Sequence, residues 1–133
     1  MTEDALANAL KRRREISIAV IGRRTGRAIT IPVWFVFDSG SLWLLPVYGS
    51  RTQWYRNLQK SRAVTIRVGS EQRTLQARLV KNPSAVGKVI ERFQEKYTAQ
   101  EIKRWYTGLD VAVRILLSTR PGKKNLANPD CRV

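Results

Sequence analysis

The sequence contains no histidine and only one cysteine, Cys131. Histidine is the commonest general acid or base and a frequent metal ligand, so its absence excludes Ser-His-Asp hydrolases, Cys-His proteases and histidine-based zinc enzymes. A single cysteine forms neither an intramolecular disulfide nor a Cys-rich metal site, and we expect no bound metal. If the chain catalyses a reaction, the difficult chemistry belongs to an organic cofactor.

Acidic residues are scarce as well, with 10 Asp and Glu against 25 Lys and Arg and a net charge of +15. A field of this sign attracts anions, which leaves nucleic acid, an anionic membrane surface and a multiply charged small molecule open as partners. No stretch approaches the roughly 18 apolar residues of a membrane-spanning helix. The acidic segment 1–6 is not typical of a signal peptide. We therefore expect a cytoplasmic protein without a membrane span.

The length of 133 residues, 43% of them hydrophobic, predicts a single domain. We expect this domain to cover residues 1–120, beginning with a helix over 1–14 whose N-cap is Thr2. The segment 121–133 has no hydrophobic periodicity and is predicted to be a mobile tail.

Alternating and β-branched stretches predict six strands, at residues 16–21, 29–37, 42–48, 64–68, 73–80 and 111–117. Helices are expected over 52–60, from Pro83 onward, and from Thr98 to about Tyr106. There is no βαβ alternation and no GxGxxG motif, so a Rossmann domain is not supported. A mainly β (α+β) fold fits better, as a six-stranded antiparallel split β-barrel with flanking helices, because closure removes exposed strand edges. Pro32 cannot donate a ladder hydrogen bond and marks an edge or a bulge.

The segment 22–27 is the first candidate binding element. Its two glycines permit positive φ and leave backbone N–H groups free. Three arginines and a threonine add donors suited to phosphate oxygens. An Arg-rich surface hairpin is an equally good interpretation of the segment alone. The candidate residues are Arg23, Arg24, Thr25, Gly26 and Arg27.

The segment 48–58 is the second candidate, because a glycine-containing loop leads into a helix N-terminus, where anions bind readily. Trp54 and Leu58 are four residues apart and are expected to pack on the barrel. Asn57 is a candidate for a structural hydrogen bond or for a cofactor contact. The remaining candidate residues are Gly49, Ser50, Arg51 and Thr52.

The strand around Pro32 is the third candidate. Its partly unpaired backbone is suited to hydrogen bonds with the edge of a flat heterocycle, and Pro32, Val33 and Trp34 would contact such a ring. For Phe35 and its neighbours, the simpler interpretation is that their side chains pack in the core of the barrel. Trp34 lies on the opposite face from Phe35 and needs cover from a ligand or a dimer partner.

Taken together, the segment 22–26, Pro32 and the sequence Trp54-Tyr55-x-Asn57-Leu58 resemble the deazaflavin-dependent nitroreductase family. That family is part of the flavin reductase and pyridoxamine-phosphate-oxidase-like split-barrel superfamily, and the similarity covers roughly residues 16–80. The resemblance implies a homodimer that binds coenzyme F-420, a deazaflavin with a phosphate and an oligoglutamate tail. It also implies a reductase that passes a hydride to a conjugated or electron-poor small-molecule acceptor.

The resemblance places Arg23, Arg24 and Thr25 at the cofactor phosphate, and the loop 49–51 beside the ring. The family commonly has lysine where Arg24 stands and arginine or a similar residue where Ile29 stands. Related branches bind FMN, FAD or haem-type ligands, so FMN is the alternative cofactor.

A proton for the acceptor would come from solvent or from a phenol, with Tyr48, Tyr97 and Tyr106 as candidates. Trp105 and Tyr106 are candidates for the acceptor pocket, with a role in the core or an interface as the alternative. Two other functions stay open. One is a cofactor carrier without turnover. The other is a basic nucleic-acid-binding protein, the less favoured because no base-reading motif is present.

Overall fold

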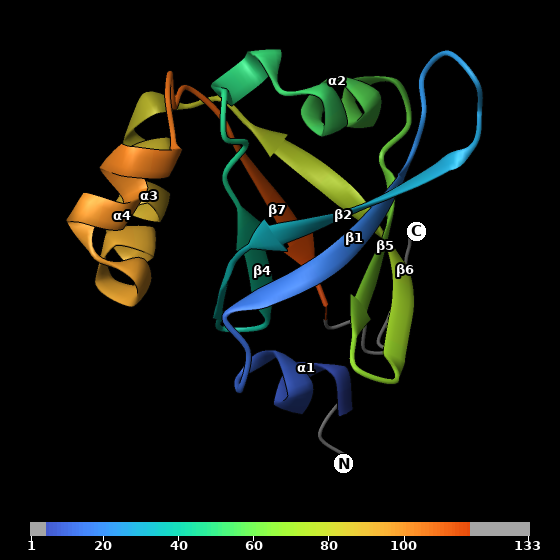
Figure 1. Ribbon diagram of the computed structural model, residues 1–133, viewed down its shortest axis with the longest axis horizontal. Helices are drawn as coiled ribbons and strands as arrows, with labels where there is room; N and C mark the ends of the chain where they lie inside the picture. Colours follow the sequence, from blue (N-terminus) through green and yellow to red (C-terminus); the bar gives the residue numbers. More distant parts are fainter. Residues whose placement is uncertain (1–4, 118–133) are drawn as a thin grey trace.

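The computed structural model describes residues 5–117 and shows one curled antiparallel sheet of seven strands (Figure 1). The order across the sheet is β2-β1-β5-β6-β7-β4-β3, and each neighbouring pair is antiparallel. The strands are β1 (Glu15–Ile21), β2 (Ala28–Trp34), β3 (Val36–Asp38), β4 (Ser41–Leu44), β5 (Ala63–Val68), β6 (Glu71–Val80) and β7 (Ala112–Leu116). The two ends of this order, β2 and β3, are consecutive in the chain, so the sheet curls round on itself, although β2 and β3 do not pair with each other. The predicted split barrel is confirmed.

The number of strands differs from the prediction because the expected strand 29–37 is interrupted at Phe35. The Phe35 N–H donates to the hydroxyl of Tyr97 at 3.1 Å, and the Phe35 carbonyl accepts from the same hydroxyl and from Lys96 Nζ, each at 2.9 Å. The Tyr97 hydroxyl also lies 2.6 Å from the carbonyl of Arg14. Two side chains of one helix thus satisfy the backbone groups that a longer strand would have paired.

Other boundaries also differ from the sequence analysis. The strand predicted over 42–48 ends at Leu44, ahead of Pro46, which lacks the N–H for a further ladder bond. The N-terminal helix α1 (Ala5–Leu10) ends well before residue 14. The predicted N-cap at Thr2 and the predicted tail 121–133 lie outside the described residues.

The remaining helices surround the barrel (Figure 1). A short 3-10 turn, η1 (Gly49–Arg51), precedes α2 (Gln53–Lys60) at one end, and α1 lies at the other. The helices α3 (Pro83–Tyr97) and α4 (Ala99–Trp105) lie together beside the sheet. The predicted division between these two helices is confirmed at Thr98, whose Oγ1 accepts from the Glu101 N–H at 3.2 Å.

Two hydrophobic cores hold these layers together. The larger fills the barrel and includes Trp54 and Leu58, as their spacing predicted. The smaller lies between the sheet and the helices α3 and α4. Strand β2 is the exception, because Ala28–Trp34 is largely apolar yet exposed along most of its length. It is an end strand of the sheet, so only β1 pairs with it among the described strands. Within residues 5–117 no helix is both long and apolar enough to span a membrane.

The hydroxyl of Tyr97 gives a test of what fixes the strand interruption. We expect Tyr97→Phe to lower the free energy of unfolding by about 1–3 kcal/mol, because it leaves the buried Phe35 N–H without a partner. Tyr55→Phe is the matched control, since the buried Tyr55 hydroxyl has no hydrogen-bond partner in the described structure. Its removal should be neutral or stabilising. Denaturant unfolding of both variants measures the difference, and equal effects would contradict this account.

Candidate functional site

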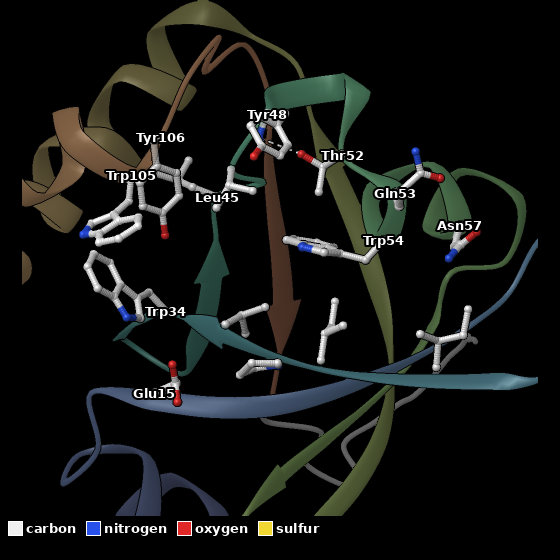
Figure 2. Close-up of a pocket in the computed structure, with 15 residues that line it drawn as sticks. Glu15, Trp34, Leu45, Tyr48, Thr52, Gln53, Trp54, Asn57, Trp105 and Tyr106 are labelled. Atoms are coloured by element: carbon white, nitrogen blue, oxygen red, sulfur yellow. Dashed lines mark hydrogen bonds between the residues drawn. The ribbon is translucent and has the colours of Figure 1, made fainter.

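A cleft of about 540 Å³ opens between β2, α2 and the end of α4 (Figure 2). This volume lies within the usual range of small-molecule sites. Strand β2 forms the floor, from Ile29 through Pro32 to Trp34. Figure 2 shows Asn57 of α2 at one end, Trp105 and Tyr106 at the other, and the ring of Trp54 between them. Among the residues that line the cleft, Glu15 is the only one with a charged side chain.

The aromatic end of the cleft is built on Trp34. Its ring stacks on Tyr97 with centroids 4.4 Å apart and an interplanar angle of 5°, and the ring of Tyr106 lies 6.1 Å away. Tyr97 therefore provides part of the cover that we expected a ligand or a dimer partner to provide for Trp34. Trp105 is 55% exposed, and its Nε1 donates to Glu101.

The three candidate tyrosines have different surroundings. Tyr106 is 7% exposed, its hydroxyl makes no hydrogen bond within residues 5–117, and Figure 2 shows that hydroxyl pointing into the cleft. Burial raises the pKa of Tyr106 far above its ordinary value, and Tyr97 adds to the shift, so the phenol stays protonated. Tyr48 also lines the cleft but is 58% exposed. Tyr97 does not line it, and burial raises its pKa to about 12.

A second, cationic hollow of about 380 Å³ lies at the C-terminal end of α2, formed by the turn 22–26 with Lys60 and Ser61. The turn is closed by a bond from the Gly26 N–H to the Gly22 carbonyl at 2.9 Å. Arg24 is exposed and makes no hydrogen bond within the described residues. The candidates Arg23, Arg24, Thr25 and Gly26 all line this hollow. Arg27 lines neither hollow.

Arg23 lies between the two hollows. Its guanidinium donates to Asn57 Oδ1 and to Gln53 Oε1, each at 2.8 Å, and both of these side chains line the apolar cleft. The contact joins the turn 22–26 to α2.

The loop before α2 is held by an internal carboxylate. The Ser50 N–H and hydroxyl donate to the two oxygens of Asp110, each at 2.8 Å, and these bonds lower the pKa of Asp110. Gly49 has a φ of +61°, and a Cβ there would lie 2.0 Å from the Gly108 carbonyl oxygen. Gly49, Ser50 and Arg51 therefore form a packed turn behind the cleft and do not line it. Thr52 does line it, and its Oγ1 accepts from the Tyr48 N–H at 2.8 Å.

The structure thus brings most of the sequence-based candidates together in two adjoining hollows. Pro32, Val33, Trp34, Thr52, Trp54 and Asn57 line the cleft. Sequence reasoning missed Gln53, Lys60 and Glu15. Gln53 and Lys60 could have been predicted from the sequence. They lie four residues before and three residues after Asn57, so they share its side of the helix. Glu15 carries no local signal, because its place depends on the pairing of β1 with β2.

A family model and several solved structures match this chain. The family model described as F420H(2)-dependent quinone reductase matches residues 2–118. A conserved hypothetical protein of Mycobacterium tuberculosis is 21% identical, with a TM-score of 0.68 over 90% of this chain and 82% of that one. A structure described as an F420-H2 dependent reductase is 17% identical, with a TM-score of 0.61 over 77% of this chain and 94% of that one.

A protein described as a domain-swapped dimer is also 17% identical, with a TM-score of 0.62 over 77% of this chain and 80% of that one. At these identities the solved structures show the fold. No curated protein matches the chain.

The packing of the turn behind the cleft predicts unequal costs for two glycine substitutions. Gly26 and Gly49 both have positive φ, but a Cβ at Gly26 meets nothing within 4 Å. We expect Gly26→Ala to cost about 1–2 kcal/mol of stability from backbone strain. Gly49→Ala should cost about 1–3 kcal/mol more, because the added methyl overlaps the Gly108 carbonyl. Thermal and denaturant unfolding measure both variants, and a cost at Gly49 no larger than at Gly26 would refute the described packing.

Proposed function

The chain belongs to the F420H(2)-dependent quinone reductase family, and from that premise we propose that its cleft binds the ring of coenzyme F-420 beside a quinone-type acceptor. The chain is accordingly an oxidoreductase that uses a deazaflavin, as its motifs led us to expect. The observation that supports the location best is the junction of an apolar cleft with a cationic hollow. A flat ring with a polyanionic tail needs both environments side by side.

The residues present fit that cofactor. Strand β2 offers an apolar surface without a covering element, and its outer edge has no strand partner among the described residues. Asn57 lines the cleft and is 5% exposed, yet its amide nitrogen donates to no described residue. Arg24 and Thr25 provide donors in the adjoining hollow for phosphate and carboxylate oxygens. The net charge of +15 would attract the anionic tail from a distance.

Coenzyme F-420 supplies the hydride when it is bound, and the chain's own residues orient the reactants and stabilise charge. The apolar side chains of β2 and the buried Trp54 give a bound ring an apolar surface that disfavours water beside it. The Tyr106 hydroxyl is a protonated donor in a buried position, suited to an acceptor oxygen that gains negative charge. A donor held in place before the reaction avoids the reorganisation that water would require. In this proposal the final proton comes from solvent, because the raised pKa of Tyr106 makes it a poor acid.

We also propose that a second copy of the chain covers the open side of the cleft. Four large hydrophobic residues are exposed in the described structure, and three of them, Ile29, Tyr48 and Trp105, line the cleft. Such a concentration is typical of an interaction surface. The solved relative described as a domain-swapped dimer is consistent with a homodimer. Cytoplasmic localisation, as expected from the sequence, is part of the same proposal.

Equilibrium titration tests the cofactor. Purified protein is titrated with coenzyme F-420 and, separately, with FMN, following tryptophan fluorescence at moderate and at high salt. We expect saturable binding of coenzyme F-420 that weakens as salt rises, because anionic contacts are screened. Arg24→Ala should weaken it further, whereas Arg67→Ala, an exposed arginine on β5 away from both hollows, should not. If the protein bound FMN and not coenzyme F-420, FMN would be the cofactor instead. If it bound neither and bound nucleic acid tightly, the proposal would be overturned.

The two tyrosines of the cleft give a second test. We expect Tyr106→Phe to lower kcat with a soluble quinone by about tenfold to a hundredfold, since it removes a donor aimed at developing charge. Tyr48→Phe should change kcat by less than about twofold, because the exposed hydroxyl competes with water for its partners. Steady-state kinetics with the reduced coenzyme measure both. An unchanged kcat in the Tyr106 variant would remove that residue from the mechanism.

A further inference from the structure

We infer that Arg23 is a positioning residue, which orients the Asn57 amide so that its NH2 group donates into the cleft. The phosphate contacts are then left to Arg24, Thr25 and the backbone of the turn 22–26. This inference rests on the proposed function, because it concerns the contact between the cleft and the cofactor ring. It departs from the family resemblance, which implied a phosphate contact for Arg23.

Three of the five guanidinium N–H donors of Arg23 are used within the protein. Its Nη1 donates to Asn57 Oδ1 at 2.8 Å and to the Gln53 carbonyl at 3.4 Å, and its Nη2 donates to Gln53 Oε1 at 2.8 Å. Its backbone N–H donates to Asn57 Oδ1 at 3.1 Å. Its carbonyl accepts from Lys60 Nζ at 3.1 Å. Both the main chain and the side chain of Arg23 are therefore fixed against α2.

These bonds determine which way the Asn57 amide faces. A side-chain amide has one acceptor oxygen and one NH2 group with two donors. The oxygen accepts two bonds from Arg23, so turning the amide over would bring its NH2 group against two donors, one of them cationic. Arg23 thus favours a single orientation, in which the NH2 group faces away from the turn 22–26. Figure 2 shows the Asn57 nitrogen on the side of the cleft.

The orientation matters because the NH2 group of Asn57 faces the cleft and is unpaired within residues 5–117. Asn57 is 5% exposed, and its nitrogen donates to no residue within 5–117. A ring bound in the cleft would cut this donor off from water, so an acceptor on the ring is needed to satisfy it. The carbonyl-bearing edge of a flavin-type ring supplies such acceptors. The contact would be made with the ring itself and would not depend on the anionic tail.

A phosphate contact through the N–H groups that Arg23 already uses would break these interactions. The guanidinium would then leave Asn57 and Gln53, and Asn57 Oδ1 would lose one of its two donors. Arg24 is adjacent in the chain, exposed and without a hydrogen bond to the described residues, so it reaches an anion at no such cost. The two neighbouring arginines therefore have separate roles.

Two ligands distinguish those roles. One is coenzyme F-420, and the other is its deazaflavin ring with the ribityl chain but without phosphate and glutamates. Equilibrium dissociation constants are measured by fluorescence for the wild type, Arg23→Ala, Asn57→Ala, the double variant and Arg24→Ala. We expect Arg23→Ala and Asn57→Ala to weaken both ligands by the same factor, about 5- to 50-fold. Arg24→Ala should weaken only the complete coenzyme.

The double variant provides a test that uses only the complete coenzyme and does not require the ring without its tail. If Arg23 acts through Asn57, the double variant binds no more weakly than Asn57→Ala, whereas independent contacts would multiply their effects. Circular dichroism and thermal unfolding establish that each variant is folded. Should Arg23→Ala not fold, Arg23→Lys replaces it, and partial recovery of both affinities is expected because lysine retains one donor for Asn57 Oδ1.

The outcomes separate this inference from the proposed function. Loss of affinity for the coenzyme with unchanged binding of the tail-less ring in Arg23→Ala would overturn the inference and leave the function intact. Multiplicative effects in the double variant would do the same. Wild-type protein that binds neither ligand would overturn the proposed function itself.

Discussion

The hydrogen bonds between Tyr97 and the backbone of Phe35 are the contact on which the rest of this structure depends. They take Phe35 out of the sheet, so that one continuous segment becomes two strands, β2 and β3. These two strands lie at opposite ends of the strand order. Lys96 adds a bond to the same carbonyl, at a position where burial, together with the nearby Arg14, lowers the lysine pKa to about 8. The ring of Tyr97 then stacks on Trp34 and sets the aromatic end of the cleft. A single side chain of α3 thus connects barrel closure with the binding site.

The barrel and much of the site were predictable because their signals are local. Alternation identified the strands, Pro32 marked an edge, and the spacing of Trp54 and Leu58 identified the buried face of α2. The interruption at Phe35 was not predictable, since its β-branched and aromatic neighbours favour one strand and the deciding hydroxyl is 62 residues away. The same holds for Ser50, whose donors are taken by a carboxylate 60 residues further along the chain.

The turn 22–26 shows a more general difficulty. Its composition predicts an anion site, and the structure places a cationic hollow there. Composition does not tell which arginine faces the ligand and which is held by the protein. That distinction depends on Gln53 and Asn57, which reach Arg23 only because β1 and α2 pack together. Charge is therefore a reliable guide to the class of ligand and a poor guide to the role of each residue.

The position of β7 has a consequence for how the chain folds. This last strand lies between β6 and β4, and it pairs Ser41 with Leu116 across most of the described sequence. Until it has been synthesised, β4 and β6 each present an unpaired edge to the surroundings. Pairings over such long separations form slowly, so the nascent chain spends time with open edges that invite association with other chains. The step that completes the barrel thus also covers the two edges, on β4 and β6, that were open during synthesis.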